Sequence, residues 1–61
     1  MKQYVSFDSA LFRRMMRRRK ITIRKLAEEL DRSEGTVRAY FRNEAMPDEL
    51  FRKAVYYIWI K

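Results

Sequence analysis

One short stretch of this sequence has the residue types and the spacing needed to recognise DNA bases. It places Gly35, Arg38, Ala39 and Arg42 at positions i, i+3, i+4 and i+7, which form one face of a helix. An arginine can donate two hydrogen bonds to guanine in the major groove, and small side chains let the helix backbone come close to the bases. The spacing therefore predicts a recognition helix whose outer face enters the major groove of duplex DNA.

Three residues at the start of this helix have alternative roles. Glu34 either complements the helix dipole or accepts a hydrogen bond from the amino group of cytosine. Gly35 is either a surface glycine without a function or a point where the backbone approaches DNA. Thr36 either bonds a phosphate, contacts a thymine methyl group or belongs to the helix cap. The residues predicted to contact bases are Glu34, Gly35, Thr36, Arg38 and Ala39.

The positive charge of the chain is concentrated on the amino-terminal side of this helix. The net charge is +7, and the segment from Arg13 to Lys25 holds eight cations and no acid, so the rest of the chain sums to −1. Such an excess is typical of a surface that faces DNA phosphates. The residues predicted to contact phosphates are Arg17, Arg18, Arg19, Lys20, Thr22, Arg24, Ser33, Arg42 and Asn43.

Other interpretations of this cationic segment are a solvated helix face, an amphipathic helix on a membrane, or a surface for RNA or an acidic protein. The membrane interpretation is disfavoured because the apolar stripe beside the cations is short and contains no tryptophan. We therefore expect contact with the phosphates of double-stranded DNA.

Hydrophobic periodicity predicts the helices that position these residues. One helix, residues 23–30, follows Thr22 as its N-cap, and the recognition helix, residues 34–42, follows Ser33 after a short turn. Their core-facing residues are Ile23, Leu26, Ala27 and Leu30 in the first helix and Val37, Tyr40 and Phe41 in the second. The stretch predicts a helix-turn-helix.

Two flanking helices complete the predicted domain. The first, residues 9–19, begins after Ser6, Asp8 or Ser9, and the last, residues 47–58, begins at Pro47. Asn43 is expected to close the recognition helix in a left-handed conformation, and residues 44–46 to form a loop. The apolar stripes of the two flanking helices are Leu11, Phe12, Met15 and Met16 in the first helix and Leu50, Phe51, Ala54, Val55 and Ile58 in the last. We expect a single all-α, four-helix domain over residues 1–61.

The register of the central stretch resembles the helix-turn-helix of the Cro and phage-repressor (Xre-like) family of bacterial and phage regulators. The matching residues are Leu26, Ala27, Ser33, Thr36, Val37, Tyr40 and Pro47, and the resemblance covers about residues 12–58. It implies a sequence-specific transcriptional regulator, a small Cro-like repressor of a phage or prophage that binds its operator as a dimer.

Several residues depart from the family pattern. Ile23 replaces the usual glutamine that helps hold the DNA, and Asp31 replaces the usual turn glycine. Arg32 stands where the family has an apolar turn residue. The family often pairs an arginine with a glutamate at the positions of Met16 and Phe41, which are both apolar here. We interpret this last change as compensated, and we predict that the sulfur of Met16 contacts the ring of Phe41.

The end of the chain is too apolar to be a solvated tail. Residues 56–60 are Tyr-Tyr-Ile-Trp-Ile, and five consecutive apolar residues cannot all face inward on one helix. Family members commonly have a further helix that shapes a dimer contact, so Tyr56, Trp59 and Ile60 are predicted to form a homodimer interface. The alternative is a short terminal strand that pairs with residues 3–7 or with another subunit, and the sequence leaves both open.

Composition argues against several other classes of protein. The chain contains no cysteine, no histidine and one glycine, which disfavours disulfides, common zinc sites, phosphate-binding loops and most enzyme chemistry. We therefore expect no enzyme, no metal, no cofactor and no small-molecule ligand. No apolar run approaches the roughly 20 residues that cross a bilayer, so we expect no membrane partner and a cytoplasmic, nucleoid-associated protein. Ile23 and Glu34 keep open the alternatives of a protein-interaction module or a nonspecific nucleic-acid binder.

Overall fold

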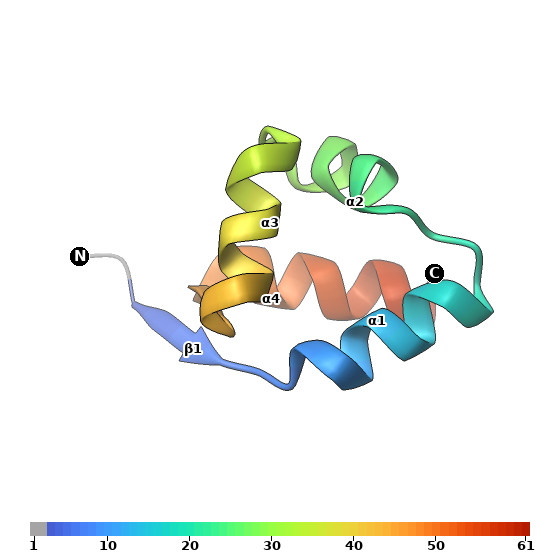
Figure 1. The fold of residues 1–61 in the computed structure, drawn as a ribbon, viewed down its shortest axis with the longest axis horizontal. Coiled ribbons are helices and arrows are strands. Elements are labelled where there is room, and N and C mark those ends of the chain that lie inside the picture. Colours follow the sequence, from blue (N-terminus) through green and yellow to red (C-terminus); the bar gives the residue numbers. More distant parts are fainter. Residues whose placement is uncertain (1–2) are drawn as a thin grey trace.

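Four α-helices and two short strands make up residues 3–61, the part of the chain that the computed structural model describes (Figure 1). The elements are β1 (Tyr4–Ser6), α1 (Ser9–Arg18), α2 (Ile23–Leu30), α3 (Glu34–Asn43), β2 (Ala45–Pro47), α4 (Asp48–Val55) and a final π-helical segment, η1 (Tyr56–Ile60). The predicted all-α domain with a helix-turn-helix and short strands is confirmed. Residues 1–7 are expected from the sequence to be an extended arm or a short strand; Met1 and Lys2 lie outside the described residues, and Tyr4–Ser6 form a strand.

Side-chain caps begin the first three helices. Asp8 caps α1, which selects it from the three candidates. The hydroxyl of Thr22 accepts a hydrogen bond of 3.1 Å from the backbone N–H of Lys25 at the start of α2. Ser33 caps α3 in the same way, through the N–H of Thr36 at 3.1 Å. Both caps of the helix-turn-helix are therefore the residues that the sequence predicted.

Helix ends differ from the predictions by one residue in three places. Helix α1 ends at Arg18, one residue earlier than expected. Glu44, and not Asn43, adopts the left-handed conformation after α3, with φ 53° and ψ 42°. Pro47 precedes α4 with an extended ψ of 141° and does not form its first helical residue. The predicted left-handed Asn43 and helical Pro47 were therefore wrong.

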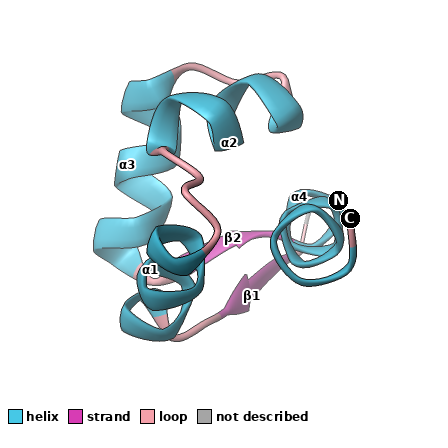
Figure 2. Cartoon of the chain, turned by 90° about the vertical axis from the view of Figure 1, so that its right-hand side faces the viewer, coloured by secondary structure: helices cyan, strands magenta, loops and turns pink. Residues whose placement is uncertain are grey.

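Long-range contacts accompany the differences at Glu44 and Pro47. The Glu44 carboxylate accepts hydrogen bonds from the backbone N–H and the hydroxyl of Ser9, at 3.1 Å each. Residues 45–47 were expected to belong to a loop and a helix, but they pair with residues 4–6 in an antiparallel ladder that aligns Val5 with Met46. Figure 2 shows the two strands side by side, next to α4. The pairing buries Met46 completely.

The aromatic tail remains helical. It continues α4 as η1, and the N–H of Lys61 donates to the carbonyl of Tyr56 at 2.8 Å. The partner of the amino-terminal strand is the segment between α3 and α4. The alternative in which the tail forms a strand with residues 3–7 is therefore wrong.

The core lies between α1, the helix-turn-helix and α4. Its members are Phe7, Phe12, Met16, Leu26, Ala27, Leu30, Val37, Phe41, Met46, Leu50, Ala54 and Ile58. Tyr40, expected in the core, is only partly buried and meets the edge of Tyr4 with ring centroids 6.3 Å apart. Leu11, expected in the apolar stripe of α1, is exposed. Among the helices of residues 3–61, none has the length and apolarity needed to cross a bilayer.

Candidate nucleic-acid interface

The outer face of α3 is open to solvent as the sequence predicted. Gly35, Arg38 and Arg42 are exposed, and Ala39 is half-buried. A Cβ atom added to Gly35 would meet no atom of residues 3–61 within 4 Å, and the φ angle of this glycine is not positive. Neither packing nor backbone conformation therefore requires glycine at this position, so its cost of about 1 kcal/mol in a helix has no explanation inside the fold.

The first turn of α3 holds an ion pair. Nη2 of Arg38 lies 3.3 Å from Oε1 of Glu34, four residues earlier on the same helix. The side chains of Arg38 and Glu34 are 63% and 42% exposed, so both are accessible to a partner. The carboxylate also lies at the positive end of the helix dipole, which favours its negative charge. Glu34 thus faces both the dipole and the candidate base-contacting arginine.

Thr36 belongs to the cap of α3. The hydroxyl of Ser33 donates a hydrogen bond of 2.8 Å to the hydroxyl of Thr36, and it accepts one from the Thr36 backbone N–H. Thr36 is half-buried, whereas Ser33 is exposed. Among the three roles considered for Thr36, this geometry supports the cap role, and the Ser33 hydroxyl is engaged in the same cap.

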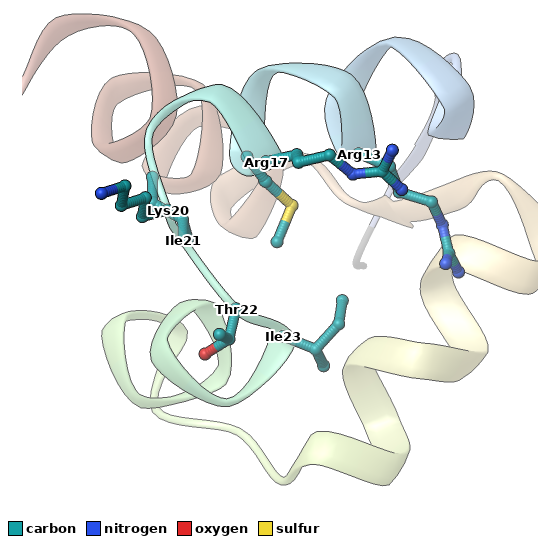
Figure 3. Close-up of a pocket in the computed structure, with 7 residues that line it drawn as sticks. Arg13, Arg17, Lys20, Ile21, Thr22 and Ile23 are labelled. Atoms are coloured by element: carbon teal, nitrogen blue, oxygen red, sulfur yellow. The ribbon is translucent and has the colours of Figure 1, made fainter.

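A groove with a cationic rim lies between the end of α1 and the start of α2 (Figure 3). Its volume is about 410 Å³, and it is lined by Arg13, Met16, Arg17, Lys20, Ile21, Thr22 and Ile23. In Figure 3, Arg13 and Arg17 extend from α1, while Thr22 and Ile23 belong to the opposite wall. The groove combines three positive charges with apolar side chains and contains no acid.

Arg13 links this groove to α3. The carbon at the centre of its guanidinium lies 5.4 Å from the centroid of the Phe41 ring on α3. A cation over an aromatic face at this distance is attracted by the ring quadrupole. Arg13 was not among the predicted phosphate contacts. The signal was present in part, because Arg13 and Arg17 are spaced i and i+4 and share one face of α1, whereas Lys20 lies beyond the end of this helix with a φ of 58°.

The cations of this region are not neutralised by the protein itself. Within residues 3–61, the ion pairs are Arg38 with Glu34, Arg52 with Asp48, and Lys61 with Glu29. None of them involves a cation between residues 13 and 25. Arg17, Arg18, Lys20, Arg24, Arg42 and Asn43 are exposed, as is Thr22. The positive charges of the arginines and of Lys20 are therefore available to an anionic partner, as are the polar groups of Asn43 and Thr22.

Arg19 differs from its neighbours. Its guanidinium donates hydrogen bonds to the backbone carbonyls of Tyr57, at 3.4 Å, of Lys61, at 3.0 Å, and of Ile58. These carbonyls belong to the last turn of the chain, where helix ends have acceptors without helical partners. Arg19 therefore caps the carboxyl end of η1, and we remove it from the set of candidate phosphate contacts.

The residues predicted to form a dimer interface are exposed to different degrees. Tyr56 is 56%, Ile60 68% and Trp59 36% exposed. The Trp59 ring meets the edge of Phe12 on α1, with centroids 4.9 Å apart. Trp59 therefore covers part of the core, while Tyr56 and Ile60 are more exposed to solvent.

No protein-family model, curated protein or solved structure matches this chain. In residues 3–61, no group of three or more Asp, Glu, His or Cys side chains is placed to hold a metal ion. The functional argument therefore depends on the geometry and charge of the helix-turn-helix and the elements around it.

Proposed function

We propose that this protein is a sequence-specific, double-stranded DNA-binding transcriptional regulator of the Cro and phage-repressor kind. The observation that supports this proposal most strongly is the outer face of α3, which is open, carries Arg38 and Arg42, and includes a glycine that the fold does not require. A helix with such a face fits the major groove, where the missing side chain of Gly35 lets the backbone approach the base edges.

In the proposed complex, the outer face of α3 contacts bases. Arg38 donates to O6 and N7 of a guanine, and Ala39 lies against the groove surface. Arg42 and Asn43, at the end of the helix, reach phosphates. Ser33, at the start of α3, reaches a phosphate by turning its hydroxyl proton away from the Thr36 hydroxyl. These contacts divide into base contacts that select sequence and phosphate contacts that set the orientation of the helix.

The cations of α1, of α2 and of the turn between them supply most of the proposed affinity. Arg17, Arg18, Lys20 and Arg24 are exposed and have no acidic partner in residues 3–61. Thr22 exposes its hydroxyl at the start of α2, where the helix dipole favours an anion. Binding of phosphates by these groups releases counterions from DNA, which makes the affinity strongly dependent on salt.

A homodimer completes the proposed regulator. One recognition helix of 10 residues contacts only a few base pairs, so a useful operator requires two copies of α3. Twofold pairing places two such helices about 34–36 Å apart on one face of the duplex. The exposed apolar surface of Tyr56, Trp59 and Ile60 supports a contact between two copies at the carboxyl-terminal end.

We further propose that the protein acts without catalysis, as a repressor at the bacterial nucleoid in the cytoplasm. The second candidate function is a protein-interaction module derived from a helix-turn-helix. It is favoured by the groove between α1 and α2, whose apolar residues include Ile23 at the position where the family has a DNA-holding glutamine.

Selection from random duplex DNA at two salt concentrations tests the proposal. We expect one enriched sequence with twofold symmetry. Five cations on phosphates, namely Arg17, Arg18, Lys20, Arg24 and Arg42, should give a slope of log K against log salt of about −4.5 per subunit. Binding that ignores sequence would indicate the nonspecific alternative, and an absence of salt-dependent binding would favour the protein-interaction module.

A further inference from the structure

We infer that Glu34 determines specificity by acting through Arg38, an inference that rests on the proposed DNA-binding function. Its carboxylate holds the Arg38 guanidinium on the outer face of α3 and disfavours contact between that guanidinium and a phosphate. Contact with a guanine remains compatible with the ion pair. Glu34 is thus a positioning residue that lowers binding to random DNA more than binding to the preferred site.

The geometry of the pair leaves Arg38 free to bond a base. Nη2 of Arg38 donates to a single oxygen, Oε1 of Glu34, at 3.3 Å. A guanidinium has five N–H donors in a planar fork, so most of them remain for another acceptor. The O6 and N7 atoms of guanine are uncharged acceptors and can bond this fork in a bidentate manner. Arg38 can therefore bond guanine while it keeps its contact with Glu34.

A phosphate in the same place would meet a different environment. Its negative charge would share one guanidinium with the carboxylate of Glu34, and the two anions would repel each other. Two like charges about 4 Å apart in water lower an equilibrium constant about fivefold. The exposure of both side chains justifies the use of water as the medium. Glu34 therefore penalises a phosphate contact of Arg38 by about this factor, and it does not penalise a guanine contact.

The test compares Glu34→Gln with the native protein on two duplexes, the selected site and a random sequence, over a range of salt concentrations. Glutamine keeps the size of the side chain and removes its charge. We expect affinity for random DNA to rise about fivefold, and its salt slope to steepen by about 0.9, because the released Arg38 gains one phosphate contact. Affinity for the selected site should change less than twofold, so the specificity ratio should fall.

The chain offers a matched control on α4. Asp48 is also an acid in the first turn of its helix, and it pairs with Arg52 four residues later at 3.2 Å. Asp48→Asn therefore removes the same charge and the same kind of ion pair outside the proposed recognition helix. Any gain in affinity from this variant should be equal on both duplexes and should leave the salt slope unchanged.

A second background tests whether Glu34 acts through Arg38. In the Arg38→Ala protein, Glu34→Gln should change neither the specificity ratio nor the salt slope. If Glu34→Gln instead raises affinity for both duplexes alike, as expected for Asp48→Asn, Glu34 contributes only net charge and the inference is wrong while the proposed function stands. If the native protein shows no sequence preference, the proposed function and the inference fail together.

Discussion

Replacement of Arg19 by alanine should separate structural from DNA-binding arginines in the cationic segment. Arg19 donates hydrogen bonds to three carbonyls at the end of η1, whereas Arg18, its neighbour at the end of α1, is exposed. Hydrogen bonds to charged groups contribute about 1.5–3 kcal/mol when buried, and a cation at a helix carboxyl end contributes about 0.3–1 kcal/mol. Since the Arg19 site is largely solvent-exposed, we expect Arg19→Ala to cost about 1–2 kcal/mol of unfolding free energy.

This cost is large for so small a domain. A chain of 61 residues is expected to have an unfolding free energy of roughly 3–9 kcal/mol. A loss of about 1–2 kcal/mol should lower the Tm by roughly 4–16 °C, since each kcal/mol shifts a domain of this size by about 4–8 °C. The fluorescence of Trp59, which packs against Phe12, and circular dichroism can both follow the transition.

Alanine substitutions of Arg18 and Arg19 should have opposite effects: the first should change DNA binding and not stability, and the second should change stability and not DNA binding. Arg18→Ala should leave the Tm unchanged and reduce the salt slope by about 0.9, because it removes one proposed phosphate contact. The Arg19→Ala protein, measured at temperatures where it is folded, should show the same slope of log K against log salt as the native protein. The reasoning would be refuted by an Arg19→Ala protein with native stability and the reduced slope expected for Arg18→Ala.

Substitutions at four further sites, one of them the Phe41–Met16 pair, test other parts of the structure. Phe41→Ala should destabilise the fold by about 3–5 kcal/mol, because Phe41 is only 1% exposed. A double-mutant cycle of the milder Phe41→Leu and Met16→Leu, measured by urea unfolding, should show coupling between the two side chains. Strictly additive changes in unfolding free energy would mean that the two side chains do not interact. Arg38→Ala should cost about 1–3 kcal/mol on the selected site and much less on random DNA, and equal losses in a titration would make it a phosphate contact. Trp59→Ala should reduce cooperative binding to a full operator more than binding to a half-site, and sedimentation of one subunit per operator with the native protein would contradict the dimer. Asp31→Gly should raise the unfolding free energy by about 0.5–1 kcal/mol, since Asp31 has a φ of 57°; a lower Tm would show that its side chain is needed in the turn.

The helix-turn-helix was predictable because its signals are local. Thr22 and Ser33 lie directly before the helices that they cap, and an N-cap bond spans only three residues of chain. The apolar residues of α2 repeat with the period of the helix, so Leu26 and Leu30 were correctly placed in the core. The open face of α3 followed from the same periodicity. These features need no knowledge of the rest of the fold.

The remaining features depend on segments that are distant in sequence. Arg19 meets carbonyls about 40 residues later, which no helical period reveals, so sequence grouped it with the arginines beside it. Glu44 bonds Ser9, 35 residues away, and this contact accompanies the left-handed turn that the sequence assigned to Asn43. The pairing of β1 with β2 buries Met46, which looked like a loop residue. In each case the stabilising contact is made with a residue that is distant in sequence and that only folding brings near. Before folding, a backbone polar group or a charged side chain has no preferred partner in the chain.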